Sequence, residues 1–173
     1  MDSGEGAAFV PAAAEASSQA YAGELVGKLA AASQKVVLAE SCTAGLVSDL
    51  IARIPGASQV LWGAFVCYTV TAKAAMLGLD PLRIEQYGAV SRETACAMAE
   101  GALGKSGADI AAAVTGLAGP EGDGSAVPVG TVWIACARRG GAANAAEFHF
   151  AGSRNEVRSS AAAEVINALL KYL

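Results

Sequence analysis

Short apolar runs of strand length alternate with helical segments along this chain, and this alternation restricts the possible folds more than any other feature. Five runs are rich in β-branched and other apolar residues and are bounded by turn residues, which is typical of strands. We therefore predict strands over 35–39, 60–69, 109–114, 129–138 and 145–150. The Gly140-Gly141 turn between the last two predicts a β-hairpin.

The segments between these strands carry apolar residues at helical spacing. They predict helices over 15–32, 43–54, 71–77, 91–104 and 153–172. Thr43 and Ser91 stand at the starts of two of these helices and are favoured N-cap residues, whereas Gly78 is a favoured C-cap. Because strands and helices alternate early and a hairpin follows late, the chain is expected to form an α/β fold, a single three-layer α/β/α domain with a mixed sheet.

Charge and composition exclude several function classes. Residues 1–14 have neither the basic start nor the apolar middle of a secretory signal, so we interpret them as a flexible leader before a domain over 15–173. No apolar run reaches the roughly 20 residues that span a membrane. The four cysteines form no CxxC pair, which indicates reduced thiols and a cytoplasmic protein. A net charge of −4 without a basic cluster argues against nucleic-acid binding.

Two familiar motifs fail on inspection. Residues 116–122 have the glycine spacing of a dinucleotide fingerprint, but Pro120 and Pro128 exclude the helix that the fingerprint requires. Residues 104–106 resemble the end of a P-loop, yet Ala99 occupies the position of its first glycine. The single histidine, His149, lies in a predicted strand, and no ligand spacing indicates a metal site. We therefore expect neither a cofactor nor a metal.

The loop after the first strand carries a candidate nucleophile. Ser41 lies between a strand and a helix, where unpaired backbone N–H groups, those of Thr43 and Ala44 among them, could hold an oxyanion or a phosphate. Glu40 is expected to orient the loop by accepting such N–H groups. Alternatively, Ser41 and Thr43 only cap the helix. Cys42 is a rival nucleophile that would need a partner to stabilise its thiolate.

Two further loops follow predicted strands, so the carboxyl edge of the sheet could gather them. Lys73 lies in the first turn of a helix, where the helix dipole and burial would both lower its pKa, as a lysine base requires. Tyr68 could relay a proton or stack on a ring. Thr115 would face the cleft of Ser41, and Gly116 would let the backbone approach a ligand. The alternatives are a surface lysine, a packed tyrosine and a plain loop.

Two arginines complete the set of candidates. Arg154 and Arg158 stand at i and i+4 at the start of the last helix and therefore share one face. Guanidinium groups suit the forked binding of phosphate or carboxylate. Alternatively, both are surface arginines near Glu147 or Glu156.

From about residue 20 to its end, the chain resembles the CinA C-terminal domain family, whose motifs follow in the same order. The matching stretches are 39–45, 63–68 with Lys73, 87–93, 98–101, 113–120, 128–133 and 150–158. The resemblance implies hydrolysis of the carboxamide of nicotinamide mononucleotide (NMN) to nicotinic acid mononucleotide and ammonia, in pyridine nucleotide recycling. It also implies that no cofactor takes part.

The resemblance assigns a role to each matching position. It makes Ser41 the nucleophile and Lys73 the base, and the family's tyrosine, its Ser/Thr before the glycine loop and its late arginines correspond to Tyr68, Thr115, Arg154 and Arg158. The chain departs from the family pattern at Ala44, where glycine is common, at Val70, where asparagine is usual, and at Ser153, where aspartate is frequent.

Two other functions remain open beside NMN hydrolysis. In the first, the chain is a non-catalytic or weakly active nucleotide-binding module, and Val70 marks the lost chemistry. In the second, it is an amidase that acts on another small amide. The apolar composition and short length also favour a homo-oligomer.

Overall fold

The computed structural model describes the backbone of residues 12–173 and the side chains from residue 18 onward. One mixed sheet of five strands lies at its centre, in the order β2-β1-β3-β4-β5. The first three strands in this order are parallel, and β4 and β5 run antiparallel to their neighbours. The strands are β1 (Val36–Glu40), β2 (Leu61–Val66), β3 (Ile110–Gly116), β4 (Thr131–Arg138) and β5 (Asn144–His149). The expected mixed sheet and late hairpin are confirmed.

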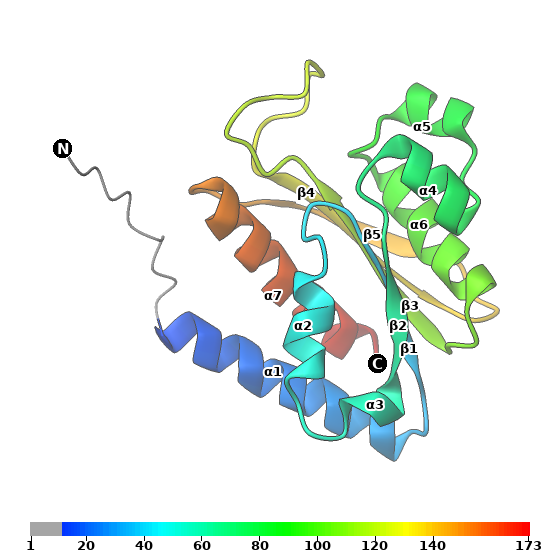
Figure 1. Cartoon of the computed structure of the whole chain (residues 1–173), viewed down its shortest axis with the longest axis vertical. Helices are drawn as coiled ribbons and strands as arrows, with labels where there is room; N and C mark the ends of the chain where they lie inside the picture. Colours follow the sequence, from blue (N-terminus) through cyan, green and yellow to red (C-terminus); the bar gives the residue numbers. More distant parts are fainter. Residues whose placement is uncertain (1–11) are drawn as a thin grey trace.

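Helices cover both faces of this sheet and make three layers, as the sequence predicts (Figure 1). The helices are α1 (Ala12–Ala31), α2 (Leu46–Ala52), α3 (Ala57–Val60), α4 (Val70–Leu77), α5 (Pro81–Tyr87), α6 (Arg92–Lys105) and α7 (Arg154–Tyr172). Helices α1, α2 and α7 lie on one side of the sheet, and α4, α5 and α6 lie on the other. Within residues 12–173, no helix is both long enough and apolar enough to cross a membrane.

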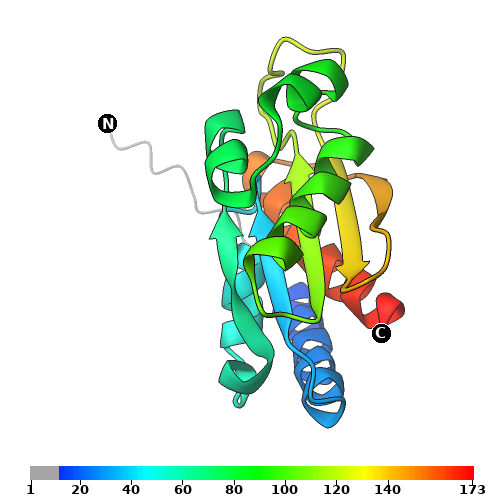
Figure 2. The same ribbon diagram turned by 90° about the vertical axis from the view of Figure 1, so that its right-hand side faces the viewer.

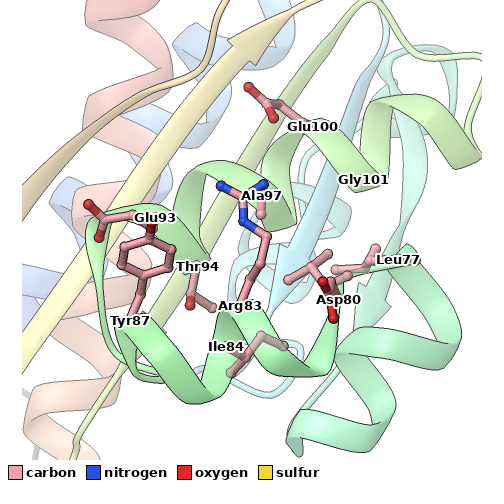
Figure 3. Close-up of a pocket in the computed structure, with 12 residues that line it drawn as sticks. Leu77, Asp80, Arg83, Ile84, Tyr87, Glu93, Thr94, Ala97, Glu100 and Gly101 are labelled. Carbon is pink, nitrogen blue, oxygen red and sulfur yellow. The ribbon is translucent and has the colours of Figure 1, made fainter.

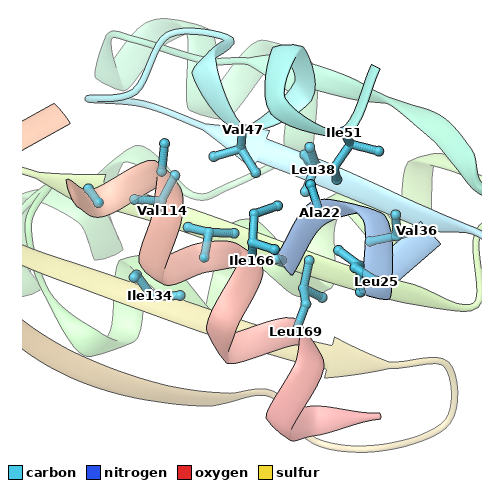
Figure 4. Packing of buried hydrophobic residues seen from close by; sticks show 14 of the residues in the cluster. Ala22, Leu25, Val36, Leu38, Val47, Ile51, Val114, Ile134, Ile166 and Leu169 are labelled. Atoms are coloured by element: carbon cyan, nitrogen blue, oxygen red, sulfur yellow. The ribbon is translucent and has the colours of Figure 1, made fainter. Parts of the chain in front are cut away.

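Strand β1 is buried along its whole length and divides its side chains between the two layers. Val36 and Leu38 belong to the core beneath α1, α2 and α7, which Figure 4 shows with Ile166 and Leu169 of α7 packed toward them. Val37 and Ala39 belong to the core on the other face. Because side chains alternate along a strand, an apolar run without polar interruptions is what a strand covered on both faces requires.

The second core is built largely from alanine. Small side chains of α6 pack against small side chains of the sheet, and this allows the helix to approach the strands closely. The alanines concerned are Ala95, Ala99 and Ala102 of α6, Ala111 and Ala113 of β3, and Ala135 and Ala137 of β4. The high alanine content of the chain therefore serves tight packing of a helix on a sheet.

Some element bounds differ from the predicted ones. Helix α5 was not predicted, although Asp80 caps it by accepting the Leu82 N–H at 3.0 Å and Pro81 occupies its first turn, a common helix start. Strand β2 stops at Val66, and α4 begins at Val70. Residues 12–14, expected in the leader, belong to α1, whereas the rest of the expected leader, 1–11, lies outside the described residues.

The three parallel strands point their carboxyl ends to one edge of the sheet, which Figure 2 shows at the top. The strand ladder continues past the last strand residues, because the Ser41 N–H donates to the Val114 carbonyl at 3.0 Å and the Cys67 N–H donates to the Glu40 carbonyl at 2.9 Å. The loops that follow β1, β2 and β3 therefore start side by side, as ligand-binding loops of α/β sheets do.

Candidate active site

The carboxylate of Glu40, at the end of β1, organises the loop that follows. It is fully buried and accepts the backbone N–H groups of Gly45, Val47 and Ser48 at 2.8, 3.2 and 2.9 Å. It also accepts the hydroxyls of Thr43, at 2.8 Å, and of Ser48. Glu40 thus satisfies the free N–H groups at the start of α2. Its role is to orient the loop, and it does not line the nearby cavity.

Two expectations for this loop are wrong. Thr43 does not cap α2, because the helix begins at Leu46 after Gly45, and the Thr43 hydroxyl donates to Glu40. The Ala44 N–H does not face the cavity as a free donor, since it donates to the Ser41 carbonyl at 3.1 Å. Ala44 also has a φ of 51°, a left-handed conformation that favours glycine, which explains why glycine is common at this position in the family that the sequence resembles.

Ser41 and Lys73 form a buried pair. The Lys73 side chain is 2% exposed, and its Nζ lies 2.8 Å from Ser41 Oγ. Nζ also donates to the Cys67 carbonyl at 3.1 Å. Lys73 makes no ion pair with an acidic side chain of the described residues. Burial therefore lowers the pKa of this amine, which moves it toward the neutral form that can accept a proton.

Thr69 fixes the backbone that carries Lys73. Its side chain caps α4 by accepting the Ala72 N–H at 3.1 Å, and its carbonyl accepts the Lys73 N–H at 3.0 Å. Lys73 consequently sits in the first turn of α4, where the positive end of the helix dipole also disfavours a cation. This is the placement that the sequence predicts for a lysine of lowered pKa.

The two cysteines near the pair are poor nucleophiles. Burial raises the pKa of the Cys42 thiol to about 11 and also raises the pKa of Cys67. A thiol with such a pKa is protonated near neutral pH, and the thiolate is the reactive form. Between Ser41 and its rival Cys42, the electrostatics therefore favour Ser41.

The two arginines of α7 have different partners. Arg154 donates to the Gly119 carbonyl at 2.7 Å and to the Tyr68 hydroxyl, so it joins the loops after β2 and β3 at the cavity. Arg158 instead donates to the carbonyls of Cys42 and Thr43, each at 3.0 Å, and does not line the cavity. Arg154 thus stands at the cavity, whereas Arg158 holds the loop that follows β1.

Thr115 and Gly116, at the end of β3, line the cavity, but their local contacts are structural. The Thr115 hydroxyl donates to the Ala89 carbonyl at 2.7 Å and so ties the segment before α6 to the sheet. A Cβ on Gly116 would lie 2.7 Å from Val132 Cγ2, so the glycine permits close packing of β3 on β4.

A cavity of about 240 Å³ brings most of the predicted site together. Ser41, Tyr68, Lys73, Thr115, Gly116 and Arg154 line it, whereas Glu40, Thr43, Ala44 and Arg158 do not. Its remaining lining residues are Cys42, Ala89, Val90, Leu117, Ala118 and Asp123. Asp123 is the charged residue among these, and it was not predicted from the sequence as a site residue. Its position in the glycine-rich loop after β3 is the sequence signal that could have identified it.

A second cavity, of about 300 Å³, lies between α4, α5 and α6 (Figure 3). Leu77, Ile84 and Ala97 contribute apolar surface to it, and Arg83 stands 6.0 Å from the centre of the Tyr87 ring. None of the residues predicted for the site lines this second cavity.

Fold and site together define a three-layer α/β domain with a buried serine–lysine pair at the carboxyl edge of its parallel strands. The family model for the CinA C-terminal domain matches residues 18–173. The chain therefore belongs to the CinA C-terminal domain family, as the sequence motifs indicate.

Relatives and solved structures agree with this assignment. A CinA-like protein of Syntrophomonas wolfei is 41% identical over 145 residues, which are 84% of this chain and 35% of that protein. The chain thus spans about a third of the length of the curated relatives it matches. Crystal structures of the competence/damage inducible protein CihA from Agrobacterium tumefaciens and of a CinA superfamily protein from Escherichia coli superpose with TM-scores of 0.87 and 0.88. They are 35% and 31% identical to this chain, cover 95% and 100% of it, and are themselves covered over 98% and 99% of their length.

Proposed function

We propose that this domain hydrolyses the carboxamide of NMN to nicotinic acid mononucleotide and ammonia, and that Ser41 and Lys73 carry out the reaction. The observation that supports this most directly is the 2.8 Å distance between Lys73 Nζ and Ser41 Oγ in the wall of a cavity. A serine is a weak nucleophile unless a neighbouring base removes its proton. A lysine whose pKa burial lowers is such a base.

The proposed reaction is acyl transfer in two halves. Neutral Lys73 takes the hydroxyl proton of Ser41 while Oγ attacks the carboxamide carbon. The C–N bond then breaks, and the proton on Lys73 goes to the leaving nitrogen, which departs as ammonia. Water attacks the resulting ester with Lys73 again accepting a proton, and collapse of this second intermediate returns the proton to Ser41 Oγ. No outside oxidant or reductant is needed.

The oxyanion formed in each half needs hydrogen-bond donors. We assign this role to the backbone N–H of Cys42, the residue after the nucleophile, because Cys42 lines the cavity and the equivalent N–H serves in other strand–turn–helix nucleophile sites. The N–H groups of Ala44, Gly45 and Val47 already have acceptors within the loop. Arg158 holds the Cys42 carbonyl and so fixes the orientation of this peptide segment.

The remaining cavity groups suit a nucleotide. Arg154 faces the cavity from α7 with a guanidinium group that can bind a phosphate, and Tyr68 offers an aromatic ring at 50% exposure against which a pyridine ring could stack.

Val70, which replaces the usual asparagine of the family, does not line the cavity and is 40% exposed. This placement favours an active enzyme over a module that has lost its chemistry, since the exchange removes no polar group from the cavity.

Ammonia release from NMN tests the proposal. We expect the purified chain to release ammonia, and Ser41→Ala and Lys73→Met to reduce kcat at least about a thousandfold, as loss of a nucleophile or its base does in other hydrolases. Lys105→Met, an exposed lysine of α6, is the matched control and should retain the wild-type rate. Nicotinamide and glutamine as alternative substrates separate NMN hydrolysis from a broader amidase.

Two outcomes would contradict the proposal. Binding of NMN without ammonia release would indicate the non-catalytic nucleotide-binding module. Turnover that survives both Ser41→Ala and Lys73→Met would exclude the serine–lysine chemistry. We also infer that the chain works in the cytoplasm as a homo-oligomer, which fractionation and light scattering would test.

A further inference from the structure

Asp123 is the only acidic residue among the described residues that line the Ser41 cavity. It lies in the loop between β3 and β4, and its Oδ1 accepts the backbone N–H of Ser125 at 3.0 Å and the Ser125 hydroxyl at 2.6 Å. These hydrogen bonds hold the pKa of the Asp123 carboxyl below its usual range. Asp123 is therefore an anion at neutral pH, and none of the chemistry proposed above uses it.

The burial of the lining residues shows which end of the cavity is deep and which end is open to solvent. Ser41 is 7% exposed and Lys73 is 2% exposed, so the reacting pair forms the floor. Asp123, Arg154 and Tyr68 are exposed and stand at the mouth. The mouth thus presents one fixed anion and one fixed cation, and a ligand that carries charges of both signs would match it. The phosphate of a nucleotide would bind Arg154. It leaves the carboxylate of Asp123 without a positively charged ligand group opposite it.

The chemistry of NMN supplies that counterpart. Its ring nitrogen is bonded to the ribose and carries a formal positive charge, and it lies meta to the ring carbon that bears the carboxamide. When the carboxamide carbon is at Ser41, the ring nitrogen and its ribose therefore point away from the floor and toward the mouth.

We propose that Asp123 is a specificity-determining residue that favours an amide carried on a cationic pyridinium ring over the same amide on a neutral ring. The inference rests on the proposed function, because it takes the carboxamide to be held at Ser41. Asp123 does not touch the reacting atoms and acts on the charge of the ring. Reduced NMN provides the comparison, since its dihydropyridine ring is neutral and the rest of the molecule is unchanged.

The test compares NMN with reduced NMN on wild type and on Asp123→Asn. The readouts are kcat/KM for ammonia release and, independently, Kd by calorimetry on the same two proteins carrying Ser41→Ala, which should prevent turnover during the titration. Substitution by asparagine preserves shape and removes charge, so we expect the preference for NMN over reduced NMN to fall about fivefold, as expected for a partly solvated ion pair. Dividing the variant's ratio by the wild-type ratio cancels the different intrinsic reactivity of the two amides. The loss should shrink at high ionic strength, because salt screens exposed charges.

Glu121→Gln is the matched control, since Glu121 is exposed in the same loop and does not line the cavity. The preference of Glu121→Gln for NMN over reduced NMN should equal that of the wild type. If Asp123→Asn lowers kcat/KM equally for both ligands, the inference is overturned and a contact of Asp123 with the ribose hydroxyls is indicated. An unchanged ratio would also overturn it. If wild type releases no ammonia but the ratio of Kd values falls in Asp123→Asn, the proposed function fails while the charge selection by Asp123 stands.

Discussion

Lys73 Nζ lies 2.8 Å from Ser41 Oγ although 32 positions separate the two residues in the chain. Parallel pairing of β1 with β2 produces this contact, because it aligns Glu40 with Val66 and starts the next loops side by side. One loop then presents the serine, and α4 presents the lysine from its first turn. The pairing of neighbouring strands thus brings the two side chains together. Because Lys73 is buried, both the pH dependence of activity and the folding stability should depend on it.

The first prediction concerns the pH profile of kcat/KM for NMN. Burial lowers the pKa of Lys73 from its ordinary value of 10.5, and only the neutral amine can accept the serine proton. We expect kcat/KM to rise with pH through this lowered pKa and to level off before 10.5. A profile measured with a pH-independent ammonia assay checks this. A rate that still rises tenfold per pH unit up to 10.5 would mean that the amine keeps its ordinary pKa.

The second prediction concerns the stability of Lys73→Met. A buried ammonium without an acidic partner destabilises the folded state, so replacing it with an apolar side chain of similar length should raise Tm. Each 1 kcal/mol gained corresponds to about 2–4 °C in a domain of this size. Because the folded-state pKa lies below the unfolded value, the unfolded chain binds more protons between these two pKa values.

The gain in folding stability of Lys73→Met over wild type is therefore largest below the folded-state pKa of Lys73 and disappears as pH rises toward 10.5. Urea unfolding of both proteins at neutral pH and near 10.5 measures it. Lys105→Met, at an exposed position, should show no such difference. A Lys73→Met variant less stable than wild type at neutral pH would show that the lysine contributes more through its hydrogen bonds than it costs through desolvation.

Much of this arrangement could be predicted from the sequence. The apolar runs at 35–39, 60–69 and 109–114 identified three strands, and the polar residues after them identified the edge at which Ser41, Lys73 and Thr115 meet. The three layers, the mixed sheet and the late hairpin follow from general rules for alternating strands and helices, whereas the strand order was not predicted. These are local or periodic signals, and a single sequence contains them.

Some errors were local, since Asp80 and Pro81 are start signals of the α5 helix that was not predicted, but others lie where a side chain reaches a distant segment. Nothing near Arg158 in the sequence shows that it reaches the carbonyls of Cys42 and Thr43, more than a hundred positions away. Glu40 likewise replaces Thr43 as the group that satisfies the start of α2, because its carboxylate is buried under the loop. Such contacts depend on the packing of whole elements, which periodicity does not encode.

The third prediction separates the two arginines of α7. Arg154→Ala should raise KM for NMN about tenfold or more, the effect of losing a charge-assisted hydrogen bond, with a smaller change in kcat. Arg158→Ala should mainly lower kcat, because the carbonyls of Cys42 and Thr43 lose their donors and the nucleophile loop loosens. Steady-state kinetics on NMN measure both effects.

Nicotinamide riboside, which lacks the phosphate, is the control substrate for this pair. Arg154→Ala should lose less on it than on NMN, the remaining loss coming from its bonds to Tyr68 and Gly119, whereas Arg158→Ala should be impaired equally on both substrates. If both variants lose only affinity for NMN and are normal on the riboside, Arg158 also binds the phosphate and its contact with the loop is incidental.

The fourth prediction concerns Glu40→Gln. Glutamine keeps the shape of the side chain, but its NH₂ group replaces one carboxylate oxygen. It then faces either the N–H donors of Gly45 and Val47, which bind Oε2, or the N–H donor of Ser48, which binds Oε1. We expect the free energy of unfolding to fall by about 2–4 kcal/mol, the range for breaking a buried network around a charged acceptor. Denaturant unfolding measures the loss. Glu24→Gln, which removes an exposed ion pair with Lys28, should change stability by less than about 0.5 kcal/mol.

The fifth prediction tests the contact that seats α4 on α6. A Cβ on Gly101 would lie 2.6 Å from the Leu77 carbonyl oxygen and 3.0 Å from Leu77 Cβ, so Gly101→Ala must displace the end of α4. Figure 3 shows Gly101 on α6 and Leu77 on α4 among the residues that line the second cavity. Overpacking of this kind costs about 1–3 kcal/mol, and here it acts on the helix that carries Lys73 one turn earlier.

We therefore expect Gly101→Ala to lower both Tm and kcat, with KM for NMN nearly unchanged. Gly104→Ala is the control on the same helix, because nothing lies within 4 Å of the position that its Cβ would take. Alanine there should stabilise α6 by about 0.5–1 kcal/mol and leave kcat unchanged. Should Gly101→Ala lose stability and keep full kcat, the position of Lys73 would be set by the Thr69 cap and the Cys67 carbonyl alone, independently of how α4 sits on α6.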